Sequence, residues 1–251
     1  MTAPDAGDAK ERLIFALDVD HPDDAESLID ELAREVGLFK VGKQLFVRTG
    51  PEIVRRIHAR GGAVFLDLKF HDIPRTVALA GVEAARLGVR MFDVHASGGA
   101  EMMRATVEAV AAACARERLA VPQILAVTVL TSLAAPDLRR LGIAGGVPRQ
   151  VERLARLAAA SGCAGVVASP REARALRRAC GPDLVLVTPG VRPAAAAWDD
   201  QKRVLTPAAA VRAGADFLVV GRPIRDAARP FEAARAIVAE MARAFAARAA
   251  H

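Results

Sequence analysis

The sequence predicts a (β/α)8 TIM barrel, an α/β fold in which parallel strands and helices alternate within a single domain. Short apolar runs rich in Val, Ile and Phe recur along the chain at the spacing of βα units. Segments with helical periodicity separate these runs, and the length of 251 residues suits one such barrel. An open, doubly wound sheet is the alternative, but no Gly-x-Gly-x-x-Gly follows the first run.

Each predicted strand is a nearly continuous apolar run bounded by Gly, Pro or charged residues. Such runs are typical of parallel strands that are covered on both faces. In chain order the eight predicted strands are residues 13–18, 38–41, 63–68, 91–95, 123–129, 165–168, 184–188 and 217–220.

The predicted helices lie between these strands and are amphipathic. In the first of them, residues 23–36, the side chains of Ala25, Leu28, Ile29 and Leu32 share one face, and acidic residues begin the segment. The later helices are predicted at residues 52–60, 76–87, 99–118, 150–161, 171–179, 207–213 and 230–250. We expect residues 1–10 to form a flexible tail and residues 11–251 to form the catalytic barrel.

The charge of the chain is basic, with a formal net charge of +6. Such a surplus attracts nucleic acid, an anionic membrane or a phosphorylated small molecule, so charge alone does not choose among them. No stretch approaches the roughly 20 apolar residues of a membrane span, and the first ten residues lack the apolar segment of a secretory signal. We therefore expect a cytoplasmic location, with no membrane partner.

The three cysteines, Cys114, Cys163 and Cys180, are too few and too dispersed for a disulfide framework. No Cys-x-x-Cys pair or close Cys/His spacing suggests zinc. We interpret them as reduced core residues and expect no metal site.

Polar residues cluster at or just beyond the carboxyl ends of the predicted strands, where the active sites of such barrels lie. Each one alone has a plain structural explanation, such as capping a helix or filling the core. Their convergence at one end of the barrel favours a functional site. The residues are Asp18, Lys40, Asp67, Lys69, Asp72, His95, Thr128, Thr131 and Arg222.

Two lysines are informative because the chain carries only five lysines among its 35 basic residues. Lys40 and Lys69 lie among apolar neighbours, where a compact ammonium that can release a proton differs from Arg. Asp67 and Lys69 have the two-residue spacing that points both side chains to one side of a strand. The alternative is a buried network of salt bridges, which stabilises weakly because desolvation offsets the attraction.

A phosphate site is predicted near the end of the last strand. In the segment Val220-Gly221-Arg222-Pro223, glycine allows close backbone approach and Arg222 offers paired hydrogen bonds. The preceding loop, residues 189–206, contains Arg192 and Gln201 and is long enough for a lid. A simple surface insertion is the alternative interpretation of this loop.

Together these residues resemble the orotidine 5′-phosphate decarboxylase family, over almost the whole chain. The most specific segment is FLDLKFHDIPRT at residues 65–76, with its Asp-x-Lys-x-x-Asp block. Further matching segments are LDVD at 17–20, FKVGKQLF at 39–46, VHASGG at 94–99, AVTVLTS at 126–132, VTPGVRP at 187–193, DQKRVLTP at 200–207 and VVGRPI at 219–224.

The resemblance implies decarboxylation of orotidine 5′-phosphate to UMP in de novo pyrimidine biosynthesis, catalysed by a carboxy-lyase without a cofactor. Lys69 would donate the proton to the C6 carbanion, and Asp67 and Lys40 would complete the charged array at the reacting carboxylate. Asp72 and Thr76 would reach into the site of a partner subunit, which implies a homodimer.

The resemblance also implies the contacts that hold the nucleotide. Asp18 and Lys40 would bind the ribose hydroxyls, Asp67 would lie against the substrate, and Thr131 would meet the pyrimidine edge. The phosphate would be bound by Arg192, Gln201, Gly221 and Arg222.

Two positions depart from the family pattern. Arg75 stands where related sequences often carry a smaller amide, and the lid reads AAAAWDDQ, with Trp198, where Gly or Ser is common. These departures concern the lid and local contacts more than the reaction.

Two other functions remain open from the sequence. A sugar-phosphate aldolase or β-keto acid decarboxylase of the same suprafamily would share the Asp-x-Lys-x-x-Asp motif but use magnesium. A nucleic-acid-binding module would fit the basic charge, but the chain has no Tyr and only 4% aromatic residues, so surfaces for base stacking are scarce. We expect no nucleic-acid partner.

Overall fold

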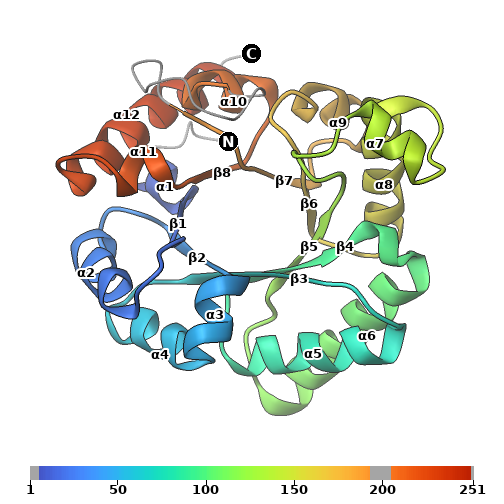
Figure 1. Ribbon diagram of the computed structural model, residues 1–251, viewed down its shortest axis with the longest axis horizontal. Coiled ribbons are helices and arrows are strands. Elements are labelled where there is room, and N and C mark those ends of the chain that lie inside the picture. Colours follow the sequence, from blue (N-terminus) through green and yellow to red (C-terminus); the bar gives the residue numbers. More distant parts are fainter. Residues whose placement is uncertain (1–5, 193–204, 250–251) are drawn as a thin grey trace. The chain divides into compact units, whose positions relative to one another are not determined.

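The computed structural model describes residues 6–192 and 205–249. Its eight strands are all parallel where their pairing is defined, and they are ordered β1 to β8 in a closed barrel with helices between them (Figure 1). The (β/α)8 fold predicted from the sequence is confirmed.

Every predicted strand is present, with ends that differ by at most two residues. The strands are β1 (Leu13–Ala16), β2 (Leu38–Gly42), β3 (Val64–Phe70), β4 (Met91–His95), β5 (Gln123–Val127), β6 (Gly165–Val167), β7 (Val185–Thr188) and β8 (Phe217–Val220). Their apolar residues are almost all buried, as strands covered on both faces require.

The helices predicted from periodicity are also present. They are α2 (Pro22–Leu32), α4 (Glu52–Ala59), α5 (Pro74–Arg86), α6 (Ala100–Glu117), α8 (Gly146–Ala160), α9 (Ala173–Cys180), α10 (Pro207–Ala213) and α12 (Pro230–Ala249). Apart from α10, the described helices of seven residues or fewer were not predicted, because one or two turns rarely show a clear periodic pattern. These are α1 (Ala6–Glu11), α3 (Lys43–Thr49), η1 (Ala96–Gly98), α7 (Ala135–Arg140) and α11 (Arg222–Arg225).

The amino-terminal segment differs from the expected flexible tail. Residues 6–10 belong to helix α1, in which Ala9 is fully buried, and α1 packs against α12. The first five residues lie outside the described part of the chain.

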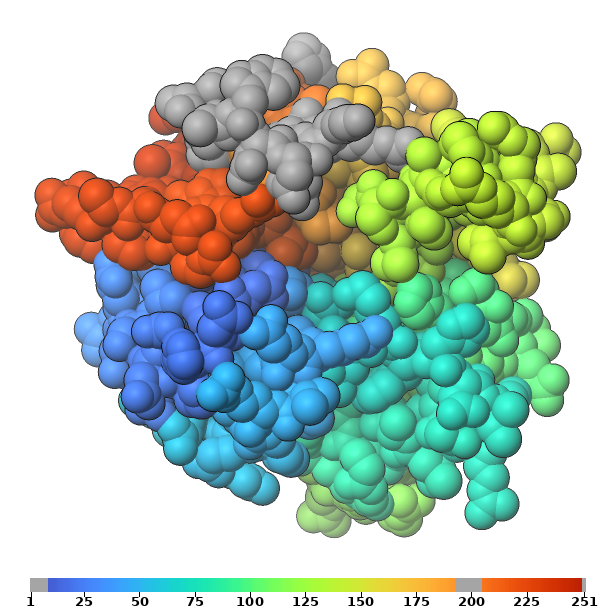
Figure 2. Space-filling view, viewed as in Figure 1, coloured from blue at the N-terminus to red at the C-terminus, as the bar shows by residue number. Residues whose placement is uncertain are grey.

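The chain divides into two compact units, Met1–Asp67 with Thr188–His251 and Leu68–Val187. In the first unit, β1 pairs with both β2 and β8, so Ile14 lies opposite Leu38 on one side and Val219 on the other. Helix α12, in red, lies against α2, in blue, on the face shown in Figure 2. This unit is therefore built from the two ends of the chain.

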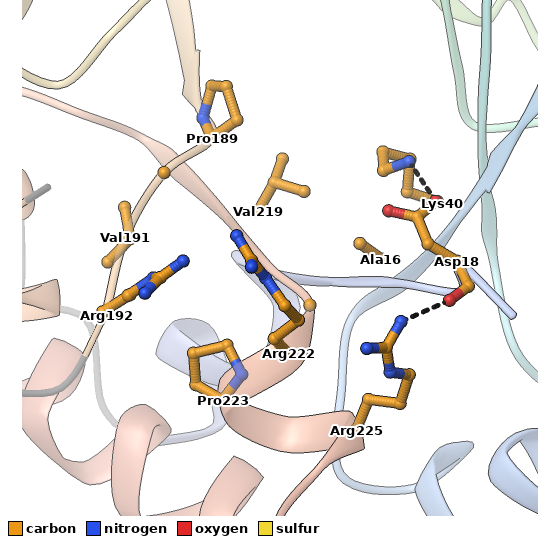
Figure 3. Close-up of a pocket in the computed structure, with 12 residues that line it drawn as sticks. Ala16, Asp18, Lys40, Pro189, Val191, Arg192, Val219, Arg222, Pro223 and Arg225 are labelled. Atoms are coloured by element: carbon orange, nitrogen blue, oxygen red, sulfur yellow. Dashed lines mark hydrogen bonds and ion pairs between the residues drawn. The ribbon is translucent and has the colours of Figure 1, made fainter. Parts of the chain in front are cut away.

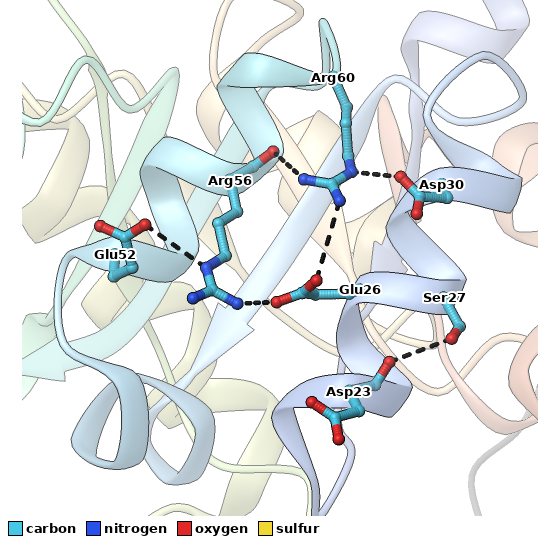
Figure 4. Close-up of polar contacts among 7 residues, drawn as sticks. All are labelled: Asp23, Glu26, Ser27, Asp30, Glu52, Arg56 and Arg60. Atoms are coloured by element: carbon cyan, nitrogen blue, oxygen red, sulfur yellow. Dashed lines mark hydrogen bonds and ion pairs between the residues drawn. The ribbon is translucent and has the colours of Figure 1, made fainter.

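Ion pairs join α2 to α4 on the surface of the first unit. Arg56 contacts Glu26 and also Glu52 of its own helix, while Arg60 contacts Asp30 and Glu26 (Figure 4). Because the groups are partly exposed to water, each such pair contributes only about 0–1 kcal/mol. The buried apolar faces of the two helices contribute more to their docking.

The second unit depends on two close approaches that glycine permits. A Cβ at Gly81 of α5 would lie 3.0 Å from Thr106 Cγ2 of α6 and 3.1 Å from a ring carbon of Phe92. A Cβ at Gly165 of β6 would lie 2.3 Å from the carbonyl oxygen of Val185 in β7. Gly165 therefore excludes a larger side chain, while a Cβ at Gly81 would require its neighbours to shift by a few tenths of an ångström.

The cysteines are free thiols, with Cys114 and Cys163 buried and Cys180 half-buried. Burial raises the pKa of the Cys163 thiol to about 12, so it stays protonated at neutral pH. No helix in the described ranges is both long and apolar enough to cross a membrane.

Candidate functional site

A buried lysine lies between two carboxylates in the first unit. Lys40 comes from β2, and its ammonium donates a hydrogen bond to Asp18 Oδ1 at 2.9 Å, just after β1. The same nitrogen lies 3.1 Å from Asp67 Oδ2 on β3. The strand register places Gly42 opposite Asp67 and Ala16 opposite Lys40, so these side chains meet near the carboxyl ends of neighbouring strands.

The charge on Lys40 is stabilised by its neighbours. Burial favours the neutral amine, but the attraction of Asp67 and Asp18 outweighs it, and the pKa of Lys40 rises above its ordinary value. Lys40 is therefore a permanent cation at neutral pH. It suits the binding and orientation of an anionic or hydroxyl-bearing ligand, and it is a poor proton donor.

A pocket of about 170 Å³ opens beside this ion cluster. Asp18 and Lys40 line one side, and Arg192 and Arg222 line the other, with their guanidinium groups turned toward the same space (Figure 3). A Cβ at Gly221 would lie 3.3 Å from Ala16 Cβ, so glycine keeps the backbone close to β1. Converging guanidinium groups are suited to a phosphoryl group.

The size of the pocket limits what it can hold. Pockets for drug-sized ligands measure about 300–1,000 Å³, so this smaller pocket matches the size of a phosphoryl group with part of a sugar. On its far side, Arg192 donates its backbone N–H to the carbonyl of Leu205 at 3.0 Å, and Val191 and Leu205 form an isolated bridge. This bridge joins the two ends of the loop at residues 189–206, which was interpreted from the sequence as a lid.

Arg225 in the same pocket was missed by the sequence analysis. One guanidinium nitrogen donates to the backbone carbonyl of Asp18 at 2.6 Å, and the side chain also pairs with Asp226. Arg225 thereby links α11 to the segment that follows β1. Its one sequence signal is its position three residues after Arg222, which is weak in a chain so rich in arginine.

The second unit contains Lys69, whose ammonium lies 3.9 Å from Asp93 Oδ2 of β4. Lys69 has a backbone φ of +51°, in the left-handed region. The two-residue alternation of a regular strand therefore does not determine the direction of its side chain, contrary to the assumption made from the spacing. Asp93 was also missed, although a charged residue inside an apolar run is a signal in itself.

The other predicted residues of this unit occupy loops and a helix start. Asp72 is exposed and accepts the backbone N–H of Ile73 at 2.6 Å, and Thr76 is exposed in the first turn of α5. Thr131 is exposed in the turn after β5. Exposure at the amino end of α5 leaves Asp72 and Thr76 available for an intermolecular contact.

Two further residues singled out at strand ends have structural contacts. Thr128 is buried and donates its hydroxyl to the carbonyl of Val167 at 3.0 Å. The ring of His95 lies against that of His71, with centroids 5.3 Å apart. Gln201 and Trp198 lie outside the described residues, so their predicted roles are not placed.

One known protein family matches most of the chain. The model of the orotidine 5′-phosphate decarboxylase / HUMPS family matches residues 11–237. The chain belongs to this family. The match spans the elements that carry Lys40, Asp67, Lys69 and Arg222.

Individual orotidine 5′-phosphate decarboxylases are similar over nearly their full length. That of Geobacter sulfurreducens is 56% identical over 233 residues, which cover 93% of this chain and 97% of the relative. That of Geotalea daltonii is 55% identical over 234 residues, with the same coverage. The crystal structure of the Lactobacillus acidophilus enzyme matches with a TM-score of 0.82 and 36% identity, covering 91% of this chain and 98% of that one.

Proposed function

We propose that this chain decarboxylates orotidine 5′-phosphate to UMP, the last step of de novo pyrimidine biosynthesis, as a carboxy-lyase that uses no cofactor. One observation carries the assignment on geometric grounds: the Asp18–Lys40–Asp67 cluster borders the pocket lined by Arg192 and Arg222. An ionic cluster for a ribose and its reacting base thus adjoins a site for a 5′-phosphate. The family and the names of its close relatives agree.

The reaction needs stabilisation of a carbanion. Loss of carbon dioxide leaves an electron pair on C6 of the pyrimidine, with no adjacent carbonyl and no cofactor to accept it. In our proposal the ammonium of Lys69 stabilises this charge and then donates its proton to C6, which gives UMP and a neutral lysine that regains a proton from solvent.

The size of this effect can be bounded. Two unit charges about 4 Å apart interact by about 4 kcal/mol at an effective dielectric constant of about 20. If the interaction develops only in the transition state, it accelerates the reaction by roughly three orders of magnitude. Lys69 alone therefore cannot account for a larger acceleration, and in our proposal the binding energy of the remote phosphate supplies further stabilisation of the transition state.

The binding roles that we propose are those that the family resemblance implies. Asp18 and Lys40 hold the ribose hydroxyls, and Asp67 lies against the reacting carboxylate. Thr131 meets the edge of the base. The phosphate is bound by Arg192, Gly221, Arg222 and Gln201.

The proposed assembly is a homodimer in which Asp72 and Thr76 complete the site of the partner subunit. Their exposure at the start of α5 supports this role. We further propose that residues 11–251 act as one catalytic domain and that the protein works in the cytoplasm.

The deciding experiment follows the loss of the orotate chromophore at a fixed ultraviolet wavelength, in buffer that contains EDTA. The wild-type chain should turn over orotidine 5′-phosphate fully without added metal. The Lys69→Ala variant should lose nearly all turnover while it binds UMP with unchanged affinity. Substantial turnover by Lys69→Ala would refute the proposed role of this lysine.

The same assay separates the magnesium-dependent alternatives. A sugar-phosphate aldolase or β-keto acid decarboxylase of the suprafamily would be inactive in EDTA and would recover with Mg²⁺. A chain inactive on orotidine 5′-phosphate with or without Mg²⁺ would overturn the assignment altogether.

A further inference from the structure

Lys69 has an unusual backbone conformation for a strand residue. Its φ of +51° lies in the left-handed region, which is disfavoured for residues that carry a Cβ. Among the described residues only one other non-glycine residue has a positive φ: Arg118, which is the C-cap of α6, where this conformation is common. Lys69 has no such helix-capping role, so surrounding contacts must maintain its conformation.

Asp93 supplies contacts to both parts of Lys69. Its Oδ1 accepts the backbone N–H of Lys69 at 2.7 Å, and its Oδ2 lies 3.9 Å from the ammonium. Asp93 itself is fully buried in β4, between the buried apolar residues Phe92 and Val94. A carboxylate in such a place is costly unless it is paired, and the hydrogen bond from the Lys69 N–H, together with the nearby ammonium, offsets part of that cost.

We propose that Asp93 is a positioning residue: it holds Lys69 in the left-handed conformation through the backbone N–H and thereby places the ammonium for proton transfer. This inference rests on the role of Lys69 in the proposed function, and it adds a residue outside the Asp-x-Lys-x-x-Asp block. Asp93 acts through Lys69 and does not itself react with the substrate.

Two substitutions separate the contributions of the two carboxylate oxygens. Asp93→Ala removes the acceptor for the Lys69 N–H, and kcat should fall by about 100-fold, as expected when a reacting group is displaced by about 1 Å. Asp93→Asn keeps an acceptor oxygen of the same shape, so kcat should stay within about tenfold of wild type. KM for orotidine 5′-phosphate and the affinity for UMP should change by less than about threefold in both, because the phosphate pocket is untouched.

A matched control excludes loss of stability as the cause. Val110 is fully buried in α6 of the same unit, and its side chain is apolar. Val110→Ala should lower Tm at least as much as Asp93→Asn, yet leave kcat within about twofold of wild type. If kcat follows Tm across all three variants, Asp93 has only a structural role and the inference is overturned.

Crystal structures of the variants test the backbone directly, without any assay. Lys69 should move to a negative φ in Asp93→Ala and keep a positive φ in Asp93→Asn. A left-handed Lys69 in Asp93→Ala, with its ammonium unmoved, would refute the inference even if activity falls. Should Asp93→Ala fail to fold, Asp93→Ser, which is smaller than Asn and leaves its hydroxyl too far from the N–H, takes its place.

The failures of the two proposals are distinguishable. Wild-type protein that does not decarboxylate orotidine 5′-phosphate would defeat the proposed function, while the crystal structures would still decide whether Asp93 holds Lys69. Active wild type with full kcat in Asp93→Ala would defeat the inference alone.

Discussion

The ammonium of Lys40 lies 3.1 Å from Oδ2 of Asp67, and the side chains of both residues are nearly buried, with exposed fractions of 11% and 12%. An ion pair in this environment adds little net stability when it is complete, because desolvation offsets the attraction. Removal of one partner is different, since the remaining charge is left without compensation.

We therefore expect Lys40→Met to lower the free energy of unfolding at pH 7 by about 3 kcal/mol, near the low end for a broken buried pair, because Asp18 is half exposed. Urea denaturation would measure the change. Lys43 offers a matched control, because it is an exposed lysine at the start of α3. Lys43→Met should change the free energy by less than about 0.5 kcal/mol, and an equal effect of both substitutions would contradict the interpretation.

The pH dependence of stability should report the same lysine. Since the pKa of Lys40 in the folded protein is raised above its ordinary 10.5, its contribution is complete below about pH 10.5 and is lost as the pH rises through the folded value. The difference in unfolding free energy between wild type and Lys40→Met should be constant from about pH 7 to 10 and shrink above that range. A difference that grows with alkalinity would show that the pKa is lowered instead.

Arg222 should act on substrate affinity through the phosphate. A hydrogen bond to a charged group contributes about 1.5–3 kcal/mol, so Arg222→Ala should raise KM for orotidine 5′-phosphate by about 10–100-fold. The control is Arg229→Ala, which removes an exposed arginine paired with Glu232, and its KM should match wild type. Steady-state kinetics at constant ionic strength would decide, because equal effects would indicate general electrostatic attraction without a specific contact.

Gly165 should be intolerant of substitution for a reason of packing alone. In Gly165→Ala the new Cβ would meet the Val185 carbonyl oxygen at 2.3 Å, so β6 and β7 must separate. We expect a loss of more than about 2 kcal/mol in unfolding free energy. Gly61→Ala is a useful comparison, because its Cβ would have open space and only the positive φ would oppose it. Thermal unfolding of the two variants side by side would show whether the clash dominates.

The strands were predictable because burial on both faces leaves long apolar runs, and the lysines because they interrupt such runs near strand ends. Asp93 was not predicted as a site residue. It lies in the middle of an apolar run, and the run was interpreted only as a strand. The left-handed φ of Lys69 has no local sequence signal, since it depends on a hydrogen bond that the Lys69 N–H donates to a residue 24 positions away. Arg225 was one arginine among many, and only the fold brings it to Asp18.

The pairing of β1 with β8 has a consequence for the order in which the protein is made. Asp18 and Lys40 leave the ribosome early, but the arginines that share their pocket follow more than 150 residues later. A growing chain thus carries one side of the pocket without the other while these residues are made, and nucleotide can protect it from unfolding or proteolysis only once the arginines have emerged. Nascent chains arrested before Arg192 should gain no protease resistance from UMP, whereas the finished protein should.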